Sequence, residues 1–290
     1  MKKYELVNIG KSQYKLDSKT INQVLEFVLN MDKKGVFLLD NIDTNLAEKI
    51  IKIYEKIQSG YPLAYIINNV NFFGIDFYVD ENVLIPRDDT EVLVLQVIKN
   101  QKFRGENHKN SVFIDIGTGS GIIPISILKT KEIRFENCFA LELSPKAFQV
   151  AKKNIGIHNL EEKINLINID FRNFDFGQLD GKDLVITANL PYIKEKDFNN
   201  MDFGVYTFEP KVALYGGVET GFELYEELIN KLFDLKSNFK SLVLFIEIGF
   251  DQYETSKNFL SKKGLKFEYF KDTNNIERVI KIKFKEDKLQ

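Results

Sequence analysis

The residues best suited to chemistry form the segment Asn189-Leu190-Pro191-Tyr192, within the run DLVITANLPYIK. Residues 183–188 are apolar and rich in β-branched side chains, which is typical of a buried strand. Asn189 ends this run, and Pro191 lacks the amide that a further ladder hydrogen bond needs. Because ligands of open α/β sheets bind beyond the carboxyl ends of strands, an amide and an aromatic ring are delivered to the expected site. Asn and Pro are also ordinary turn residues, so this segment alone does not identify a site.

A glycine cluster follows another predicted strand, at 112–116, and leads into a predicted helix. Its members are Gly117, Thr118, Gly119, Ser120 and Gly121. Glycines permit a tight turn and let a ligand approach the backbone, with helix amides facing it. The spacing differs from the dinucleotide pattern G-x-G-x-x-G, because Ile122 occupies the position of the third glycine. The cluster therefore favours a smaller cofactor that carries an amino acid.

Two more predicted strands end in side chains that suit a nucleoside. Glu142 lies at the end of one strand, where a carboxylate can accept hydrogen bonds from both hydroxyls of a ribose. Asp170 lies at the end of the next strand and could accept a hydrogen bond from an exocyclic amine. The ring of Phe171 could cover the face of a base. Acids at strand ends are often merely solvated, and Phe171 also fits a core position. Three successive strands with such ends nevertheless predict one cofactor site.

The elements that must position these residues alternate between strand and helix from residue 111 onward. The predicted strands are 112–116, 138–143, 164–169, 183–188, 241–248, 265–270 and 278–284, and the predicted helices are 121–129, 145–155, 221–236 and 251–261. Such alternation predicts an α/β fold with a seven-stranded, mostly parallel, Rossmann-like sheet and helices on both faces. The last two strands have no long helix between them, which predicts one antiparallel strand.

Residues 1–70 have helical periodicity and predict a small helical domain. The two apolar stripes are Ile21, Val24, Leu25, Val28 and Leu29, and Leu46, Ile50, Ile51, Tyr54 and Ile57. Core packing explains both stripes, and nothing in this domain looks catalytic. Residues 71–86 predict a β-hairpin connection, and residues 87–290 the larger domain. Asp88 and Glu91 have the spacing of a capping box for its first helix.

Composition limits the classes of protein that the chain can represent. Hydrophobic residues make up 44% of the 290 residues, which suffices for a sizeable core. The net charge of −2 argues against a long nucleic acid as the main partner. Cys138, the single cysteine, predicts a buried core thiol and a reducing compartment. No signal-peptide pattern, membrane-spanning run or metal-binding cluster is apparent, so we expect a cytoplasmic protein without a metal.

The motifs together resemble the class I S-adenosylmethionine-dependent methyltransferases that modify planar nitrogens. More narrowly, the chain resembles the release-factor glutamine methyltransferases of the HemK/PrmC type. The matching segments, in family order, are GYPLAYI at 60–66, VLIPRDDTE at 83–91, DIGTGSG at 115–121, ANLPY at 188–192, EPKVALYGG at 209–217 and FIEIG at 245–249. The helical domain also matches in size and position.

The resemblance implies a reaction and its partners. S-adenosylmethionine would be the methyl donor and S-adenosylhomocysteine the product. The acceptor would be the glutamine of the Gly-Gly-Gln loop in class 1 peptide chain release factors, with residues 1–70 recognising that protein. No stable nucleic acid or membrane partner is implied. Neither the oligomeric state nor the preferred release factor follows from the sequence.

The resemblance also implies roles for the residues. A glutamine amide nitrogen is a poor nucleophile because its lone pair is delocalised into the carbonyl. The Asn189 side-chain oxygen and the Leu190 carbonyl would accept its N–H groups, and Tyr192 would pack against the planar amide beside Pro191. The rest of the rate enhancement would come from holding the acceptor nitrogen in line with the methyl group of the sulfonium. No strong general base would be needed. Asn189 would also adjoin the cofactor held by the glycine cluster, Glu142, Asp170 and Phe171.

Four positions depart from the family pattern. Leu190 and Asp88 replace prolines, Glu142 replaces aspartate, and Phe171 stands where tryptophan is common. The form N-L-P-Y is typical of ribosomal RNA adenine dimethyltransferases, so a nucleic-acid amino-methyltransferase acting on ribosomal RNA or DNA adenine is the alternative. Those enzymes carry their helical domain after the catalytic one, and near-neutral charge disfavours them. A binding module that retains the fold without catalysis is a third reading.

Overall fold

The computed structural model describes residues 1–100, 110–130 and 133–285. The polar stretch at 101–110, which predicts a loop and contains His108, lies outside these residues except for Asn110. The chain divides into two compact units. The first contains Met1–Asn69 and Asp202–Phe208, and the second contains Val70–Met201 and the chain from Glu209 onward.

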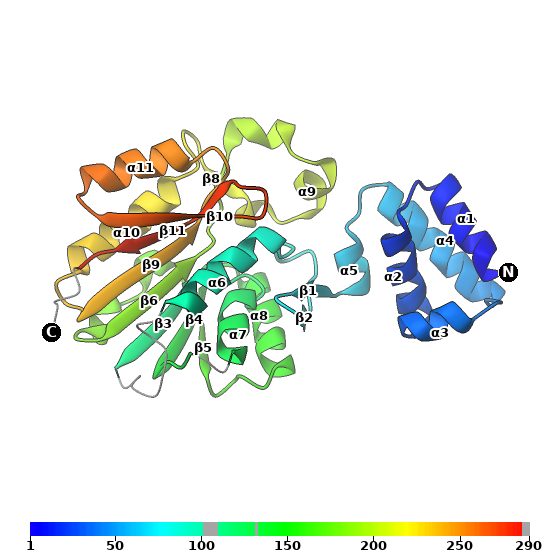
Figure 1. The fold of residues 1–290 in the computed structure, drawn as a ribbon, viewed down its shortest axis with the longest axis horizontal. Coiled ribbons are helices and arrows are strands. Elements are labelled where there is room, and N and C mark those ends of the chain that lie inside the picture. The colour runs from blue at the N-terminus through cyan, green and yellow to red at the C-terminus, as the bar shows by residue number, and fades with distance from the viewer. Residues whose placement is uncertain (101–109, 131–132, 286–290) are drawn as a thin grey trace. The chain divides into compact units, whose positions relative to one another are not determined.

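The first unit is helical, as the apolar stripes predicted (Figure 1). Its helices are α1 Lys3–Ser12, α2 Ser18–Leu29, α3 Lys33–Leu38, α4 Thr44–Gln58, α5 Leu63–Ile67 and α9 Phe203–Phe208. The carboxylate of Asp17 accepts the Thr20 amide at 2.9 Å and starts α2, and Asp43 caps α4 in the same way. The stripes of α2 and α4 pack into a common core. That α9, from far along the chain, belongs to this unit was not predicted.

The second unit begins with a short hairpin and a helix. Strands β1 Val70–Phe72 and β2 Ile75–Phe77 pair antiparallel, and a 3-10 turn at Asp88–Thr90 leads into α6 Glu91–Lys99. The predicted capping box is wrong, because the Glu91 carboxylate accepts the Phe73 amide at 2.7 Å. Glu91 therefore ties the hairpin to α6 instead of capping the helix.

The central sheet confirms the predicted fold, with seven strands in the order β10-β11-β9-β6-β3-β4-β5. The strands are β3 Ser111–Ile116, β4 Asn137–Glu142, β5 Ile164–Asn168, β6 Asp183–Ala188, β9 Ser241–Glu247, β10 Lys266–Lys271 and β11 Glu277–Lys283. β11 runs antiparallel to both of its neighbours, β9 and β10, and the other neighbouring pairs of this sheet are parallel. The chain moves outward from β3 to β5 and then returns to place β6 on the other side of β3. The carboxyl ends of β3 and β6 thus form the switch point at which such sheets bind ligands.

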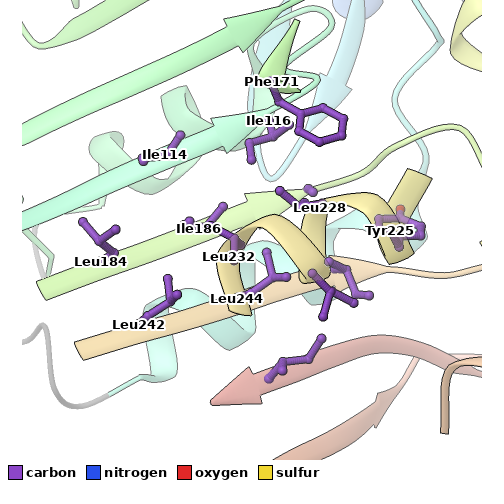
Figure 2. Close-up of a cluster of buried hydrophobic side chains, with 14 of the residues drawn as sticks. Ile114, Ile116, Phe171, Leu184, Ile186, Tyr225, Leu228, Leu232, Leu242 and Leu244 are labelled. Carbon is purple, nitrogen blue, oxygen red and sulfur yellow. The ribbon is translucent and has the colours of Figure 1, made fainter. Parts of the chain in front are cut away.

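Helices cover both faces of the sheet (Figure 1). The first face carries α6, α7 Ile122–Lys129 and α8 Pro145–Ile157, with Cys138 buried beneath them as predicted. The second carries α10 Glu223–Leu235 and α11 Tyr253–Lys262. Figure 2 shows Tyr225, Leu228 and Leu232 of α10 among the side chains of β6 and β9. This packing fixes the strand ends that carry the candidate residues.

A further two-stranded sheet lies beyond the end of β6. Strand β7, Ile193–Lys194, pairs in parallel with β8, Tyr215–Gly217. A Cβ on Gly216 would overlap the Tyr192 Cα and the Pro191 carbonyl oxygen. A glycine is therefore needed where the YGG segment meets the turn that carries Asn189.

Candidate active site

A cavity of about 310 Å³ opens at the carboxyl ends of β3, β4 and β6. This volume lies at the small end of the range for small-molecule sites. Its lining includes these residues predicted from the sequence: Gly117, Thr118, Gly119, Ser120, Glu142, Asp170, Phe171, Asn189, Leu190 and Pro191. Gly121 and Tyr192 are not part of the lining. The strand order thus brings together side chains that are up to 74 residues apart, from Gly117 to Pro191.

The glycine cluster is a turn braced on β4. The Gly117 and Thr118 amides donate to the Leu141 carbonyl at 2.9 and 3.0 Å. Gly119 has a φ of +56°, and a Cβ added there would meet no protein atom within 4 Å, because it would enter open space beside the cavity. Gly121 differs, since a Cβ there would face Ile125 and Ala151. Gly119 therefore suits close approach of a ligand, whereas Gly121 serves the packing of α7 against α8.

Glu142 braces this turn as well as lining the cavity. Its Oε2 accepts the Gly119 amide and its Oε1 accepts the Ser144 amide, both at 2.8 Å. Burial raises the pKa of Glu142 above its ordinary value, and the two backbone donors oppose that shift. Each oxygen retains a further lone pair for a ligand hydroxyl. The bracing of the glycine turn was not predicted from the sequence.

Asp170 and Phe171 lie together at the cavity wall after β5. Asp170 accepts the Arg172 amide at 2.9 Å and pairs with the Arg172 guanidinium at 3.0 Å. Its acceptors are therefore partly occupied, and its contact with an exocyclic amine stays a prediction. Phe171 is buried in the core of the sheet (Figure 2) and also lines the cavity, and its contact with a base stays a prediction.

Asn189 follows β6 and its amide is oriented by a neighbouring segment. Its Nδ2 donates to the Thr90 Oγ1 at 3.2 Å, which leaves Oδ1 as an acceptor at the cavity. Thr90 is only 1% exposed and lines the cavity too. The two residues are 99 positions apart in the chain.

Leu190 is held by the Tyr225 hydroxyl. That hydroxyl accepts the Leu190 amide at 2.9 Å and lies 2.5 Å from the Glu247 carbonyl and 3.2 Å from the Leu190 carbonyl. Since a hydroxyl has one proton, the shorter contact takes it, and the Leu190 carbonyl keeps its acceptor capacity. The Leu190 side chain packs over Gly117, where an added Cβ would lie 2.9 Å from Cδ2. Leucine in place of proline thus fills a core position and leaves the backbone acceptor in place.

The Tyr192 side chain turns away from the cavity lining. Its hydroxyl faces the Glu247 carboxylate at 3.5 Å, and its carbonyl accepts from Gln252 at 3.3 Å. Its predicted packing against a substrate amide stays a prediction. Glu247 itself is 2% exposed. Burial raises the pKa of Glu247 to about 7, and it lies next to Asn189.

Sequence reasoning missed Thr90, Glu247 and the pair Arg87–Glu209, which joins two segments at the cavity wall. All four residues lie in segments that served only to recognise the family. A buried acid at the end of β9 was the one signal that could have drawn attention to Glu247.

Asp115, two residues before the glycine cluster, is fully buried and accepts the Thr187 hydroxyl at 2.6 Å. Burial raises the pKa of Asp115 to about 7. The folded state therefore binds a proton that the unfolded chain releases near pH 4, so this residue reduces stability increasingly from about pH 4 to 7.

Asp115→Asn removes the effect. We expect the thermal midpoint of this variant, relative to the unaltered protein, to rise between pH 5 and 8, and a pH-independent difference would contradict this.

The chain is similar in sequence to curated proteins along most of its length. It is 33% identical to the release factor glutamine methyltransferase of Dictyoglomus turgidum, over 89% of this chain and 88% of that protein. It is 30% identical to the protein of the same name from Mycoplasma mycoides, over 96% of each. A family profile described as "Ribosomal protein L11 methyltransferase (PrmA)" matches residues 87–190.

Solved methyltransferase structures share the fold. The hMettl16 catalytic domain in complex with an RNA hairpin has a TM-score of 0.56 at 17% identity, over 86% of this chain and 85% of that chain. The N-terminal domain of human METTL16 in complex with SAH has a TM-score of 0.51 at 16% identity, over 95% and 94%. At such identities the likeness establishes the architecture alone. No helix within the described ranges is long and apolar enough to cross a membrane.

Proposed function

Since the chain belongs to the release factor glutamine methyltransferase family, we propose that it methylates a glutamine side-chain amide in class 1 peptide chain release factors. The donor is S-adenosylmethionine, and the acceptor lies in the Gly-Gly-Gln loop. One observation carries this proposal: the glycine turn, Glu142 and Asn189 all line the same cavity. The Nδ2 of Asn189 is bonded to Thr90, so its Oδ1 can accept a hydrogen bond from a substrate. Incubation with labelled donor, followed by mass spectrometry of the release factor's loop peptide, tests it.

The residues at the cavity fit the proposed cofactor. The open space in front of Gly119 lets a ligand approach the backbone, and Glu142 offers lone pairs to the two hydroxyls of a ribose. Phe171 offers an apolar surface to the base, beside Asp170. The cofactor supplies a methyl group on a sulfonium, which is already a good leaving group.

The chain's own contribution is to orient the acceptor nitrogen. Asn189 Oδ1 and the Leu190 carbonyl accept the two N–H groups of the substrate amide, so that its remaining lone pair faces the methyl carbon. The N–C bond forms as the S–C bond breaks, and the nitrogen then loses a proton. Alignment of this kind lowers the activation free energy by about 7–11 kcal/mol in well-oriented reactions.

The nucleic-acid alternative is not favoured by the curated relatives. Several proteins that match most of this chain, including those of Dictyoglomus turgidum and Mycoplasma mycoides, are named for release factor glutamine. A solved neighbour bound to RNA shares the fold at 17% identity, which says nothing about the acceptor. The family's work on translation factors also supports a cytoplasmic location, which we include in the proposal.

Residues 1–70 are proposed to recognise the release factor. Phe37 and Leu38 of α3 are 79% and 72% exposed, and exposed apolar side chains of this kind favour contact with a protein partner. Changing both to serine should raise the KM for the release factor about tenfold, which corresponds to a joint contribution of about 1.4 kcal/mol from the two side chains. The affinity for S-adenosylmethionine should not change.

The matched control is Ile157→Ser, at the end of α8 in the second unit, where the side chain is 52% exposed. Its kinetics should equal those of the unaltered protein. An unchanged KM in the Phe37→Ser, Leu38→Ser double variant would assign recognition to another surface.

A further inference from the structure

The orientation of the Asn189 amide decides whether the proposed chemistry works. An asparagine amide has an acceptor end and a donor end, and a half-turn about its last torsion exchanges them. With Oδ1 toward the cavity, Asn189 accepts from the substrate amide. With Nδ2 toward the cavity, it would present N–H groups to the substrate's own N–H groups. A device that fixes the first orientation is therefore part of the active site.

Two residues behind Asn189 have the chemistry to fix that orientation. Its Nδ2 donates to the Thr90 Oγ1 at 3.2 Å. Glu247 follows Ile246 of β9, which pairs with Ala188 of β6, so the two strands carry Glu247 and Asn189 to neighbouring positions. The Thr90 hydroxyl and the Asn189 amide both favour the charged form of Glu247, and so lower its pKa against the larger effect of burial. Glu247 is 2% exposed and is not part of the cavity lining, so it faces the back of Asn189 and not the substrate.

A structural ion pair does not explain why the Glu247 carboxylate is buried. The guanidinium of Arg278, the nearby cation, pairs with Asp272 at 3.1 Å and with Asp89 at 3.3 Å, and it also donates to the Ile248 carbonyl. Glu247 Oε1 has only the long contact from Tyr192, and Oε2 is buried without a hydrogen-bond partner among the described residues. Burying a carboxylate in this way costs stability. A functional role accounts for its presence.

We propose that Glu247 is a positioning residue that fixes the Asn189 amide, directly and through Thr90, so that Oδ1 faces the acceptor nitrogen. This inference rests on the function proposed above. In its ionised form, which prevails above its pKa of about 7, the Glu247 carboxylate only accepts hydrogen bonds, so it attracts the NH₂ end of Asn189 and repels the oxygen end. The effect is strong because the group is buried in a region of low dielectric.

Thr90 serves both partners at once. Its oxygen accepts from Asn189 at 3.2 Å, and its hydroxyl favours the charged form of Glu247. Asp89, the preceding residue, pairs with Arg278 of β11, which anchors the segment that carries Thr90. The segments around residues 90, 189 and 247 thereby meet at one point, and these are three of the segments by which the family is recognised.

Glu247→Gln is the first test, because glutamine keeps the shape and can present either an oxygen or an NH₂ group to Asn189. We expect kcat on the release factor to fall at least tenfold. The affinity for S-adenosylmethionine, measured by calorimetry, should stay within twofold, and the thermal midpoint should not fall. Thr90→Val, which removes the hydroxyl at nearly constant volume, should lower kcat in the same way. An unchanged kcat in Glu247→Gln would overturn the inference.

Coupling to Asn189 separates positioning from general damage. In an Asn189→Ala background, Glu247→Gln should have no further effect on the residual single-turnover rate, because the residue through which it acts is gone. A full additional loss in that background would contradict the inference. The matched control is Asp183→Asn, a buried carboxylate at the opposite end of β6, which should affect stability and not kcat.

A spectroscopic measurement tests the inference without any substrate. The side-chain amide protons of Asn189, assigned in NMR spectra by comparison with Asn189→Ala, should be shifted downfield by their acceptors and should move upfield in Glu247→Gln. Unmoved resonances would overturn the inference even if the release factor proved not to be the substrate. Conversely, moved resonances with no methylation of the release factor would overturn only the proposed function.

Discussion

Asn189→Ala is expected to lower the rate of methyl transfer about 100- to 1000-fold while leaving the affinity for S-adenosylmethionine largely intact. Interactions that matter chiefly in the transition state affect turnover more than binding, and removal of one preorganised polar group at a reacting centre has an effect of this size. Single-turnover kinetics with a release factor, together with calorimetry of donor binding, measure the two quantities separately. An equal loss of donor affinity would place Asn189 in the cofactor site alone.

Asn189→Asp is a sharper variant of the same test. It retains an acceptor oxygen but loses the Nδ2 donor to Thr90 and places a second carboxylate near Glu247. We therefore expect activity well below that of the unaltered protein. When Asn189→Asp is combined with Glu247→Gln, part of the lost activity should return, because the repulsion between the two carboxylates is removed. Equal activity of the single and the combined variant would contradict this account of the site.

Gly119→Val is expected to weaken S-adenosylmethionine binding at least 100-fold, because the new side chain would occupy the open space beside the cavity. The φ of +56° at Gly119 also strains any side chain. Gly264→Val is the matched control, since Gly264 has a φ of +64° and open space as well, yet does not line the cavity. It should lose similar stability and retain donor binding. Calorimetry with both variants checks the difference, and retained binding in Gly119→Val would remove the glycine turn from the cofactor site.

Glu142→Ala should weaken donor binding by about 1.5–3 kcal/mol, the cost typical of lost charge-assisted hydrogen bonds. The variant also leaves the Gly119 and Ser144 amides without their acceptor, so part of the loss reflects a loosened turn. Unchanged affinity would remove Glu142 from the cofactor site.

The sheet could be predicted because its signals are local. Apolar runs such as that of β6 and the periodicity of helices such as α8 lie within short windows, and the order of strands and helices then specifies a parallel sheet. The same reasoning placed Glu142 and Asn189 at strand ends, where the structure finds the cavity.

The partners of those residues could not be predicted, because they depend on packing between distant segments. Thr90 meets Asn189 across 99 positions, and Glu91 accepts from Phe73 instead of its own helix. Arg172 occupies Asp170, two residues away, because the 3-10 turn there brings the guanidinium back to the carboxylate. Glu247 was hidden in a segment that reads as an ordinary buried strand. Sequence spacing indicates on which element a side chain lies, and only tertiary packing decides what that side chain contacts.

The central claim is tested most directly by offering the enzyme and labelled S-adenosylmethionine three acceptors. They are a class 1 release factor, the same factor with the glutamine of its Gly-Gly-Gln loop changed to alanine, and ribosomal RNA. The account predicts the gain of one methyl group on the first acceptor alone, located by mass spectrometry to that glutamine. Methyl transfer to the RNA and not to the release factor would contradict it.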